Sequence, residues 1–329
     1  MISIKQIAIK CGVSVSTVSK ALNDRKDVSK KTKEKIIKTA DEMGYTANFL
    51  ARSLRTKKTY NIGIILNNTS KSFSHSFFAS VLESIQKEAE KHGYDITFIN
   101  SEIGGKKISY LKHCEYRNLD GVVIIFADFE SEEILELVNS DIPVVTIDYI
   151  FDNCSSVCSN NTSGMFDLVD YAVRMGHTKI AYIHGENTKV AGDRLASFYS
   201  AMYSHGLNIK KEYLKKSALR NAALTEKRTK ELLRLSDPPT CIIFPDDYAS
   251  ISAIRTIQKE NIDVSYMGYD GIDIAKDINL TTYEQNRTKL GELAVARLIR
   301  CIDNPDEPIE NTVVSGKIRI GDTVKRLIK

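Results

Sequence analysis

The stretch SIKQIAIKCGVSVSTVSKALN, residues 3–23, decides how the first part of this chain folds. Ser3 is a good helix N-cap and Gln6 follows three residues later, which is the arrangement of a capping box. Apolar residues then share one helical face before Gly12 ends the pattern: Ile4, Ile7, Ala8 and Cys11. The sequence therefore predicts a short amphipathic helix that begins after Ser3 and stops at Gly12.

A second short helix is predicted after a three-residue connection, because Ser14 can cap a segment whose apolar residues again fall on one face. The inward residues of this helix are Val18, Ala21 and Leu22. Its outward residues are Val15, Ser16, Ser19, Lys20 and Asn23. Two such helices joined by a tight turn form a helix-turn-helix, whose second helix enters the major groove of DNA.

A third amphipathic helix is predicted to begin at Ser29 and to end at Gly44. It buries Ile36, Ile37, Ala40 and Met43, and its outer face holds Lys30, Lys31, Lys33, Lys35 and Lys38. The charge of the chain is unevenly divided: residues 1–60 contain 14 Lys and Arg against five Asp and Glu, whereas the rest contains 32 against 37. This excess indicates a polyanionic partner. The alternative is a three-helix module with solvated lysine faces and no role with nucleic acid.

From residue 60 onward, continuous apolar strands alternate with amphipathic helices, which is typical of a doubly wound α/β fold. The predicted strands are 61–66, 96–100, 121–126, 144–148, 179–184, 241–244 and 265–269. The predicted helices lie near 78–92, 107–118, 131–139, 164–175, 192–205, 222–235 and 248–260. Two such halves, with the chain crossing between them near 150–160 and after Leu280, predict a ligand cleft at the carboxyl ends of the strands.

Several classes of protein fit this sequence poorly. No apolar run approaches the roughly 20 residues of a membrane span, and the N-terminus is not a secretory signal, so we expect a cytoplasmic protein without a membrane partner. The six cysteines and six histidines lack metal-binding spacing, and the motifs of hydrolases, dinucleotide sites and phosphate loops are missing. We therefore expect no catalytic residue, metal or cofactor. A solute-binding protein of transport is the main alternative, and an enzyme is a more distant one.

The first 54 residues resemble the headpiece of the LacI/GalR family, the lactose-repressor type of bacterial transcription regulator. The resemblance rests on IKQIA at 4–8, GVSVSTVSKALN at 12–23, Val28-Ser29, Lys31-Thr32 and Gly44-Tyr45, and NFLARSL at 48–54 is similar to the hinge helix of that family. It implies these DNA-contacting residues: Ser3, Ser14, Val15, Ser16, Thr17, Lys20, Asn23, Ser29, Asn48 and Leu54. Lys20 suits guanine and Val15 suits a thymine methyl group, while Leu54 matches the side chain that wedges between base steps.

The remainder resembles the periplasmic-binding-protein-like core of the same family, through NIGII at 61–65, DGVV at 120–123, IPVV at 142–145, GHTKIA at 176–181, Asp193-Arg194, Asp246-Asp247, GYD at 268–270 and LTT at 280–282. The resemblance implies an effector site that includes Phe77, Phe78, Asp148, Arg194, Asp247 and Asp270. A guanidinium and carboxylates bind vicinal hydroxyls and aromatic faces cover a ring, so a carbohydrate is the expected effector. The alternatives are that Asp148 or Asp247 caps a helix and that Phe77 belongs to the core.

These observations predict an all-α headpiece at 1–46, a hinge at 47–59 and a two-part α/β core at 60–329. We expect the N-subdomain to hold 60–158 and 286–319, and the C-subdomain to hold 159–285 and 320–329. One headpiece reads few base pairs, so the regulator is expected to be a homodimer on a pseudo-palindromic double-stranded operator, controlled by the effector. The sequence departs from the family pattern at Ala47, where proline is usual, and at Asp246, where asparagine is frequent.

Overall fold

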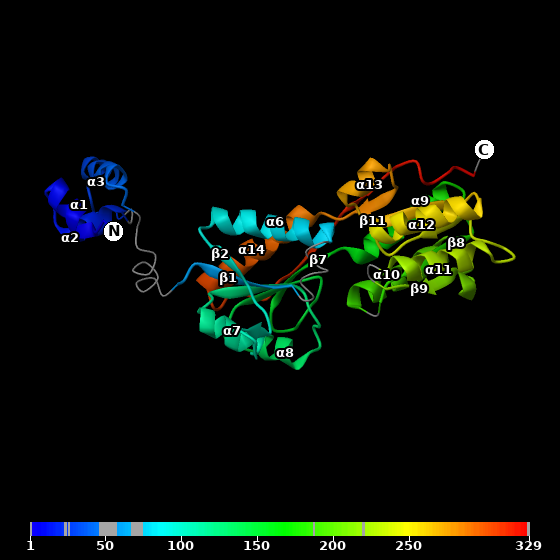
Figure 1. Ribbon diagram of the computed structural model, residues 1–329, viewed down its shortest axis with the longest axis horizontal. Helices are drawn as coiled ribbons and strands as arrows, with labels where there is room; N and C mark the ends of the chain where they lie inside the picture. Colours follow the sequence, from blue (N-terminus) through cyan, green and yellow to red (C-terminus); the bar gives the residue numbers. More distant parts are fainter. Residues whose placement is uncertain are drawn as a thin grey trace. The chain divides into compact units, whose positions relative to one another are not determined.

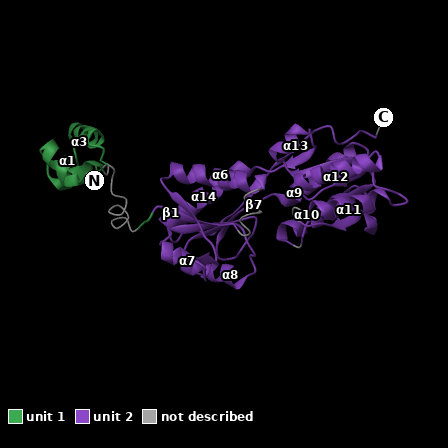
Figure 2. Ribbon diagram, viewed as in Figure 1, with its two compact units in different colours: residues 1–59 green, residues 60–329 purple. Residues whose placement is uncertain are grey.

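A computed structural model describes residues 2–22, 25, 27–45, 58–66, 75–186, 188–218 and 221–327. The chain forms two compact units, residues 1–59 and residues 60–329 (Figure 2). The first unit contains three helices, which are α1 (Ile4–Cys11), α2 (Val15–Leu22) and α3 (Lys30–Glu42). The helices predicted from the sequence are therefore present, and the fold class is confirmed for this unit.

The headpiece core is small and is built from residues of all three helices. Its buried side chains are Ile7, Ala8, Cys11, Val18, Ala21, Ile36 and Ala40. One prediction was wrong, because Ile37 is 39% exposed rather than buried. Thr39 takes an inward position instead, since α3 presents Ile36, Thr39 and Ala40 to the other two helices.

The first half of the core is a six-stranded sheet covered on both faces (Figure 1). Its strand order is β13-β7-β6-β5-β1-β2. The strands are β1 (Asn61–Leu66), β2 (Asp95–Phe98), β5 (Gly121–Phe126), β6 (Val144–Ile147), β7 (Ser155–Ser159) and β13 (Asn311–Val314), and a small hairpin pairs β3 (Glu102–Ile103) with β4 (Lys106–Lys107).

Helices α6 (Ser76–Lys91) and α14 (Arg287–Asp303) cover one face of this sheet, and α7 (Tyr110–Arg117) and α8 (Glu132–Val138) cover the other (Figure 1). Alternate side chains of each strand point to opposite faces of the sheet. Ile64 and Val123 pack with α6 and α14, whereas Ile65 and Val122 pack with α7 and α8. Burial on both faces explains why these strands are continuous apolar runs.

The second half repeats the plan with strand order β14-β12-β11-β10-β8-β9. Its strands are β8 (Ile180–His184), β9 (Leu214–Lys216), β10 (Cys241–Ile243), β11 (Ser265–Asp270), β12 (Thr282–Glu284) and β14 (Lys317–Arg319). Its helices are α9 (Asn161–Arg174), α10 (Lys189–Ser204), α11 (Ala222–Leu233), α12 (Asp247–Glu260) and the short α13 (Asp273–Asp277), with a 3₁₀ turn at Lys211–Tyr213. One apolar cluster joins α9 and α10 to the sheet, and another joins α11 and α12.

The chain passes between the halves three times, after β7, after β12 and between β13 and β14. The third crossing lies between Val314 and Lys317, so β14 belongs to the second sheet although we expected residues up to 319 in the first half. The long helix α14 and the short strands β7, β9, β12, β13 and β14 were not predicted as elements. Within the described ranges, no helix has both the length and the apolar character needed to span a membrane.

Candidate functional site

The N-terminal end of α2 carries a group of hydroxyls. Ser14 Oγ lies 2.7 Å from Ser16 Oγ and 2.8 Å from Thr17 Oγ1. The same oxygen accepts a hydrogen bond from the Thr17 backbone N–H at 3.1 Å, so Ser14 caps the helix as predicted. These side chains stand at the helix end that a helix-turn-helix directs toward bases.

The outer face of α2 is exposed, and one of its side chains forms an ion pair within the headpiece. Val15 is 44% exposed, and Lys20 Nζ pairs with Asp27 Oδ2 at 2.5 Å. This pairing lowers the pKa of the Asp27 carboxyl. A base or phosphate that recruits Lys20 must therefore compete with an ion pair, which is weak because both side chains are about half exposed.

Two other predicted DNA contacts cap helices. Ser3 and Gln6 form the reciprocal bonds of the predicted capping box at the start of α1, and Ser29 Oγ accepts from the Thr32 N–H at the start of α3. Three further predicted contacts, Asn23, Asn48 and Leu54, lie outside the described residues.

A second group of polar side chains lies where strands of the core end. We call it the polar cluster, and its members are Asp148, Asn161, Arg194, Asp246, Asp270 and Gln285. Asp148 directly follows β6, Asp270 ends β11 and Gln285 directly follows β12. Because the carboxyl ends of neighbouring parallel strands meet at one edge of a sheet, residues distant in sequence converge there.

Arg194 organises the polar cluster from α10. The residue is 8% exposed, and its guanidinium lies over the Tyr269 ring, 3.6 Å from the centroid. Nε donates to Asn161 Oδ1 at 2.8 Å and Nη1 donates to the Pro245 carbonyl at 3.0 Å. Nη2 stands 4.0 Å from Asp270 Oδ1, which is an ion pair but not a direct hydrogen bond.

The two strand-end carboxylates share an unusual backbone conformation. Asp148 has φ of 58° and Asp270 has φ of 102°. Such values are strained for residues with a side chain and are concentrated at functional sites. Asp148 Oδ1 accepts from the Ser159 N–H at 2.6 Å, and Asp270 Oδ1 accepts from Gln285 Nε2 at 2.7 Å.

Burial raises the pKa of both carboxyls. The pKa of Asp270 is raised to about 6, because loss of hydration outweighs the attraction of Arg194 and the bond from Gln285. The pKa of Asp148 is also raised by burial, against the bond from the Ser159 N–H. The attraction of Arg194 counteracts the rise at both positions, so one guanidinium serves carboxylates from both halves of the core.

Asp246 and Asp247 lie in different environments. We expected Asp247 to line the effector site or to cap a helix, and the structure assigns the helix cap to Asp246 instead. Asp247 is fully buried, where Oδ1 accepts from Thr282 Oγ1 at 2.5 Å and Oδ2 accepts from the Ile272 N–H at 2.8 Å. Its carboxylate therefore ties α12 to the start of β12 and to the loop after β11, and it has no surface for a ligand. Asp246 instead lies within the electrostatic reach of Asp270 and Arg194, and its Oδ1 caps α12 through the Ala249 N–H at 2.7 Å.

The predicted aromatic pair is also divided. Phe77 is 6% exposed and belongs to the core of the first half. Phe78 is half-buried, and its ring lies 5.2 Å from that of Phe126, at the end of β5.

A stronger aromatic group, not predicted, stands in the loops after β5 and β6. Phe129 and Tyr149 stack at 4.4 Å with an interplanar angle of 11°, and Phe151 lies 4.7 Å from Tyr149. Tyr149 is the residue after Asp148 in the chain, and we call the group of Phe129, Tyr149 and Phe151 the aromatic wall. Three aromatics spaced within the two loops that follow strands were the signal available in the sequence.

Direct contacts join the two halves beside the polar cluster. Ser76 Oγ lies 2.8 Å from Tyr248 Oη, and the His75 ring meets the Tyr248 ring edge-on at 5.0 Å. Both pairs connect the beginning of α6 to the first turn of α12. The two helix N-termini therefore meet next to Asp246.

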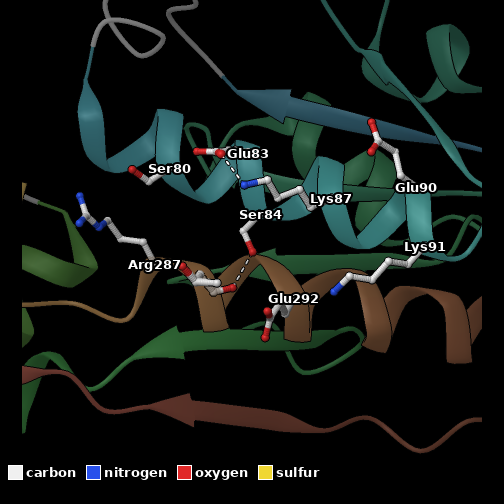
Figure 3. Close-up of a pocket in the computed structure, with 9 residues that line it drawn as sticks. Ser80, Glu83, Ser84, Lys87, Glu90, Lys91, Arg287 and Glu292 are labelled. Atoms are coloured by element: carbon white, nitrogen blue, oxygen red, sulfur yellow. Dashed lines mark hydrogen bonds and ion pairs between the residues drawn. The ribbon is translucent and has the colours of Figure 1, made fainter.

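A surface pocket elsewhere in the first half lies between α6 and α14 (Figure 3). Its charged residues alternate in sign, and Glu83 pairs with Lys87 at 2.6 Å. The two helices can approach closely because Gly291 has no side chain, and a Cβ at this position would collide with Ser84. The pocket lacks the strand ends, the strained carboxylates and the aromatic wall, so we place the candidate ligand site at the polar cluster. No group of metal ligands is present among the residues that the structure describes.

Comparison with known proteins agrees with this architecture. A family model described as periplasmic binding proteins and sugar binding domain of LacI family matches residues 59–321, and one described as bacterial regulatory proteins, lacI family, matches residues 3–48. The chain is 28% identical to the probable HTH-type transcriptional repressor ExuR of Bacillus subtilis (strain 168) over 99% of both proteins. It is also 28% identical to the HTH-type transcriptional repressor PurR of Vibrio parahaemolyticus, over 99% of this chain and 100% of the relative.

Among solved structures, the lac repressor dimer bound to operator and the anti-inducer ONPF has a similar fold. The TM-score is 0.78 with 21% sequence identity, over 98% of this chain and 99% of that chain. The family models together span the headpiece and nearly the whole core. This chain therefore belongs to the LacI family of bacterial regulatory proteins.

Proposed function

We propose that this protein is a cytoplasmic transcription repressor that binds a pseudo-palindromic operator as a homodimer, without catalytic activity. The observation that carries the proposal is the exposed face of α2, which combines a capped N-terminus, a group of side-chain hydroxyls and Lys20. This face belongs to the unit that holds the excess of basic residues in the chain. Such a face reads base edges, while the surrounding lysines hold phosphates. The names of the relatives, which are transcriptional repressors, support the direction of regulation.

The effector binds at the polar cluster, against the aromatic wall, and is a sugar or a related hydroxyl-rich compound. Arg194 and Asp270 supply a donor and an acceptor for hydroxyls, and Asp148 adds an acceptor from the other half. A ligand that bridges the halves changes how they are held together. Only an effector that binds the DNA-competent and DNA-incompetent states with different affinity can shift operator binding.

The headpiece is tested by Lys20→Ala. We expect a loss of about 1–3 kcal/mol at the preferred operator, with relaxed preference at one base pair per half-site. Lys38→Ala is the matched control, because this lysine is 80% exposed on α3 and pairs only weakly with Glu42 at 4.0 Å. Equal losses on operator and random DNA would make Lys20 a phosphate contact. Absence of DNA binding by the intact protein would favour the solute-binding alternative.

The hinge completes the mechanism. We propose that residues 48–54 form a helix only on DNA, since about seven residues are too few for a stable isolated helix. Leu54 then wedges between central base steps. Leu54→Ala should reduce operator affinity by roughly a few kcal/mol together with the bend angle. Unchanged bending, measured by fluorescence energy transfer across the operator, would contradict the wedge.

A further inference from the structure

An ion pair joins the outer face of α2 to the segment that leads into α3. Lys20 Nζ lies 2.5 Å from Asp27 Oδ2, and the two side chains are 52% and 54% exposed. The pair is also a direct hydrogen bond, with the ammonium as donor. Lys20 supplies the positive charge of α2, whose sequence is VSTVSKAL. The charge that this face presents to DNA therefore has a partner within the headpiece.

The backbone on either side of Asp27 is anchored to the headpiece. Two residues before it, the Arg25 N–H donates to the Lys20 carbonyl at 3.0 Å, at the end of α2. Directly after it, Val28 packs against the headpiece core and Ser29 caps α3. The place of Asp27 beside Lys20 is therefore set by the turn between the two helices, and not by a chance meeting of two surface side chains.

Another ion pair of the headpiece provides a comparison. Lys38 Nζ stands 4.0 Å from Glu42 Oε1, and the side chains are 80% and 53% exposed. Both residues lie on α3, four positions apart, where such pairs contribute little. Asp27 and Glu42 thus carry the same charge at nearly the same exposure. Asp27 contacts the face of α2, whereas Glu42 approaches a lysine of its own helix.

A base and a phosphate do not compete equally for the Lys20 ammonium. The group has three N–H donors, so two can reach O6 and N7 of a guanine while one remains on Asp27. A phosphate instead brings its own negative charge close to the carboxylate, and the two repel each other. Asp27 therefore permits the reading of a guanine and disfavours the use of Lys20 as a phosphate contact.

We propose that Asp27 is a positioning residue that sets the DNA specificity of the headpiece through Lys20. It directs the ammonium to a guanine and keeps the same lysine from strengthening binding to other sequences. This inference rests on the function proposed above. Phosphate contacts supply essentially all of non-specific binding and carry no sequence information. Loss of one such contact at each headpiece therefore weakens binding to random DNA more than binding to the operator.

The test uses the full-length protein and two duplexes, one that the protein selects from a randomised pool and one shuffled duplex of the same base composition. Fluorescence anisotropy measures Kd over a series of salt concentrations. Asp27→Asn removes the charge and keeps the size of the side chain. We expect the Kd for the shuffled duplex to fall about threefold or more. The Kd for the selected duplex should change less than about twofold, because the loss of orientation offsets the loss of repulsion.

The dependence on salt should change together with the affinity. Once Lys20 contacts a phosphate, it displaces one further counterion, so the slope of log K against log salt should steepen by about 0.9 per headpiece on the shuffled duplex. Selection from the randomised pool with Asp27→Asn should relax the same base pair of each half-site that Lys20→Ala relaxes. A structural role of Asp27 at the start of α3 would instead weaken binding to both duplexes by one factor.

Glu42→Gln is the matched control, because it removes the same charge from the same unit at nearly the same exposure. It should leave the ratio of the two Kd values unchanged. In a Lys20→Ala background, Asp27→Asn should also leave this ratio unchanged, since Asp27 acts through Lys20.

The inference is overturned if Asp27→Asn keeps the ratio of the two Kd values, if Glu42→Gln changes the ratio equally, or if the effect of Asp27→Asn persists without Lys20. Failure of the proposed function gives a different result. A wild-type protein that enriches no sequence from the randomised pool would refute the sequence-specific regulator before any variant is compared.

Discussion

The two halves of the core share a strand order but differ in what they place at the strand ends. Read inward from one edge, β2-β1-β5-β6-β7-β13 corresponds to β9-β8-β10-β11-β12-β14. Asp148 after β6 and Asp270 at the end of β11 occupy matching places, and both have positive φ. A repeated scaffold thus supplies two equivalent carboxylates.

The surroundings of these carboxylates diverge. In the first half, Phe129, Tyr149 and Phe151 pack on one another in the loops after β5 and β6, and Tyr149 follows Asp148 directly in the chain. In the second half, Asp270 is surrounded by Arg194, Gln285 and Asp246. The comparison shows that one half provides an apolar wall and the other provides the charge and hydrogen bonds, which is a suitable division for a ligand with an apolar face and polar edges.

The buried arginines test this difference most strongly. Arg194→Met should lower the free energy of unfolding by about 3–5 kcal/mol, because it leaves buried carboxylates without a counter-charge. Arg297 of the first half is 3% exposed, but its partners Glu307 and Glu310 are 19% and 51% exposed. Arg297→Met should therefore cost less, about 1–3 kcal/mol. Urea unfolding measures both.

Arg174→Met is the control for these variants, because Arg174 is 68% exposed and pairs with Asp170 one turn away. Its effect should stay below about 1 kcal/mol. A larger loss for Arg297→Met than for Arg194→Met would contradict the view that the buried carboxylates depend on Arg194 more strongly than the partly exposed Glu307 and Glu310 depend on Arg297.

Acid titration should reveal the same asymmetry. Folded Asp247 holds its proton up to about pH 8 and folded Asp270 up to about pH 6, whereas an unfolded Asp loses its proton near pH 4. The folded protein therefore binds more protons over these windows, and the free energy of unfolding falls as pH rises. We expect the free energy of unfolding to fall by roughly 3 kcal/mol between pH 5 and pH 8, because each unit of pKa shift corresponds to about 1.4 kcal/mol. This figure is below the sum of the two shifts, because structural relaxation around the ionised carboxyls reduces their cost.

Asp247→Asn should flatten this pH dependence of the free energy of unfolding, particularly above pH 6, and the exposed Asp273→Asn should leave it unchanged. Thermal unfolding of the three proteins across the same pH series provides the measurement. A wild-type protein whose stability rises with pH through this range would show that the carboxyls of the second half are better compensated than the geometry indicates.

The aromatic wall should give the smallest effect. Tyr149→Leu removes the ring that stacks on Phe129, while leucine restores part of the buried apolar area. We expect the loss of the stack itself to lower the free energy of unfolding by about 0.5–1.5 kcal/mol. Tyr116→Leu is the control, because Tyr116 is 70% exposed on α7. Denaturant titration compares the two variants. Equal effects would mean that the stack is a surface contact rather than a supporting element of the first half.

Local patterns in the sequence predicted a large part of this structure. The caps at Ser3, Ser14 and Ser29 bracket the headpiece helices, and the central strands β1, β5, β8, β10 and β11 stand where apolar runs indicated. These features are local, because a cap or a run of apolar residues acts within a few positions. The short strands β12, β13 and β14 have three or four residues each, too few for periodicity to identify.

The candidate site shows where local reasoning ends. The sequence by itself determined a basic helix-turn-helix followed by a doubled α/β core, and it indicated Asp148, Arg194 and Asp270. Only the tertiary structure decided that Asp247 is enclosed, that Asp246 reaches the polar cluster and that Gln285 completes it. Adjacent residues such as Asp246 and Asp247 have the same chemistry, so the sequence does not distinguish them. Their environments differ because strands and helices far apart in the chain pack around one and leave the other beside the neighbouring charges.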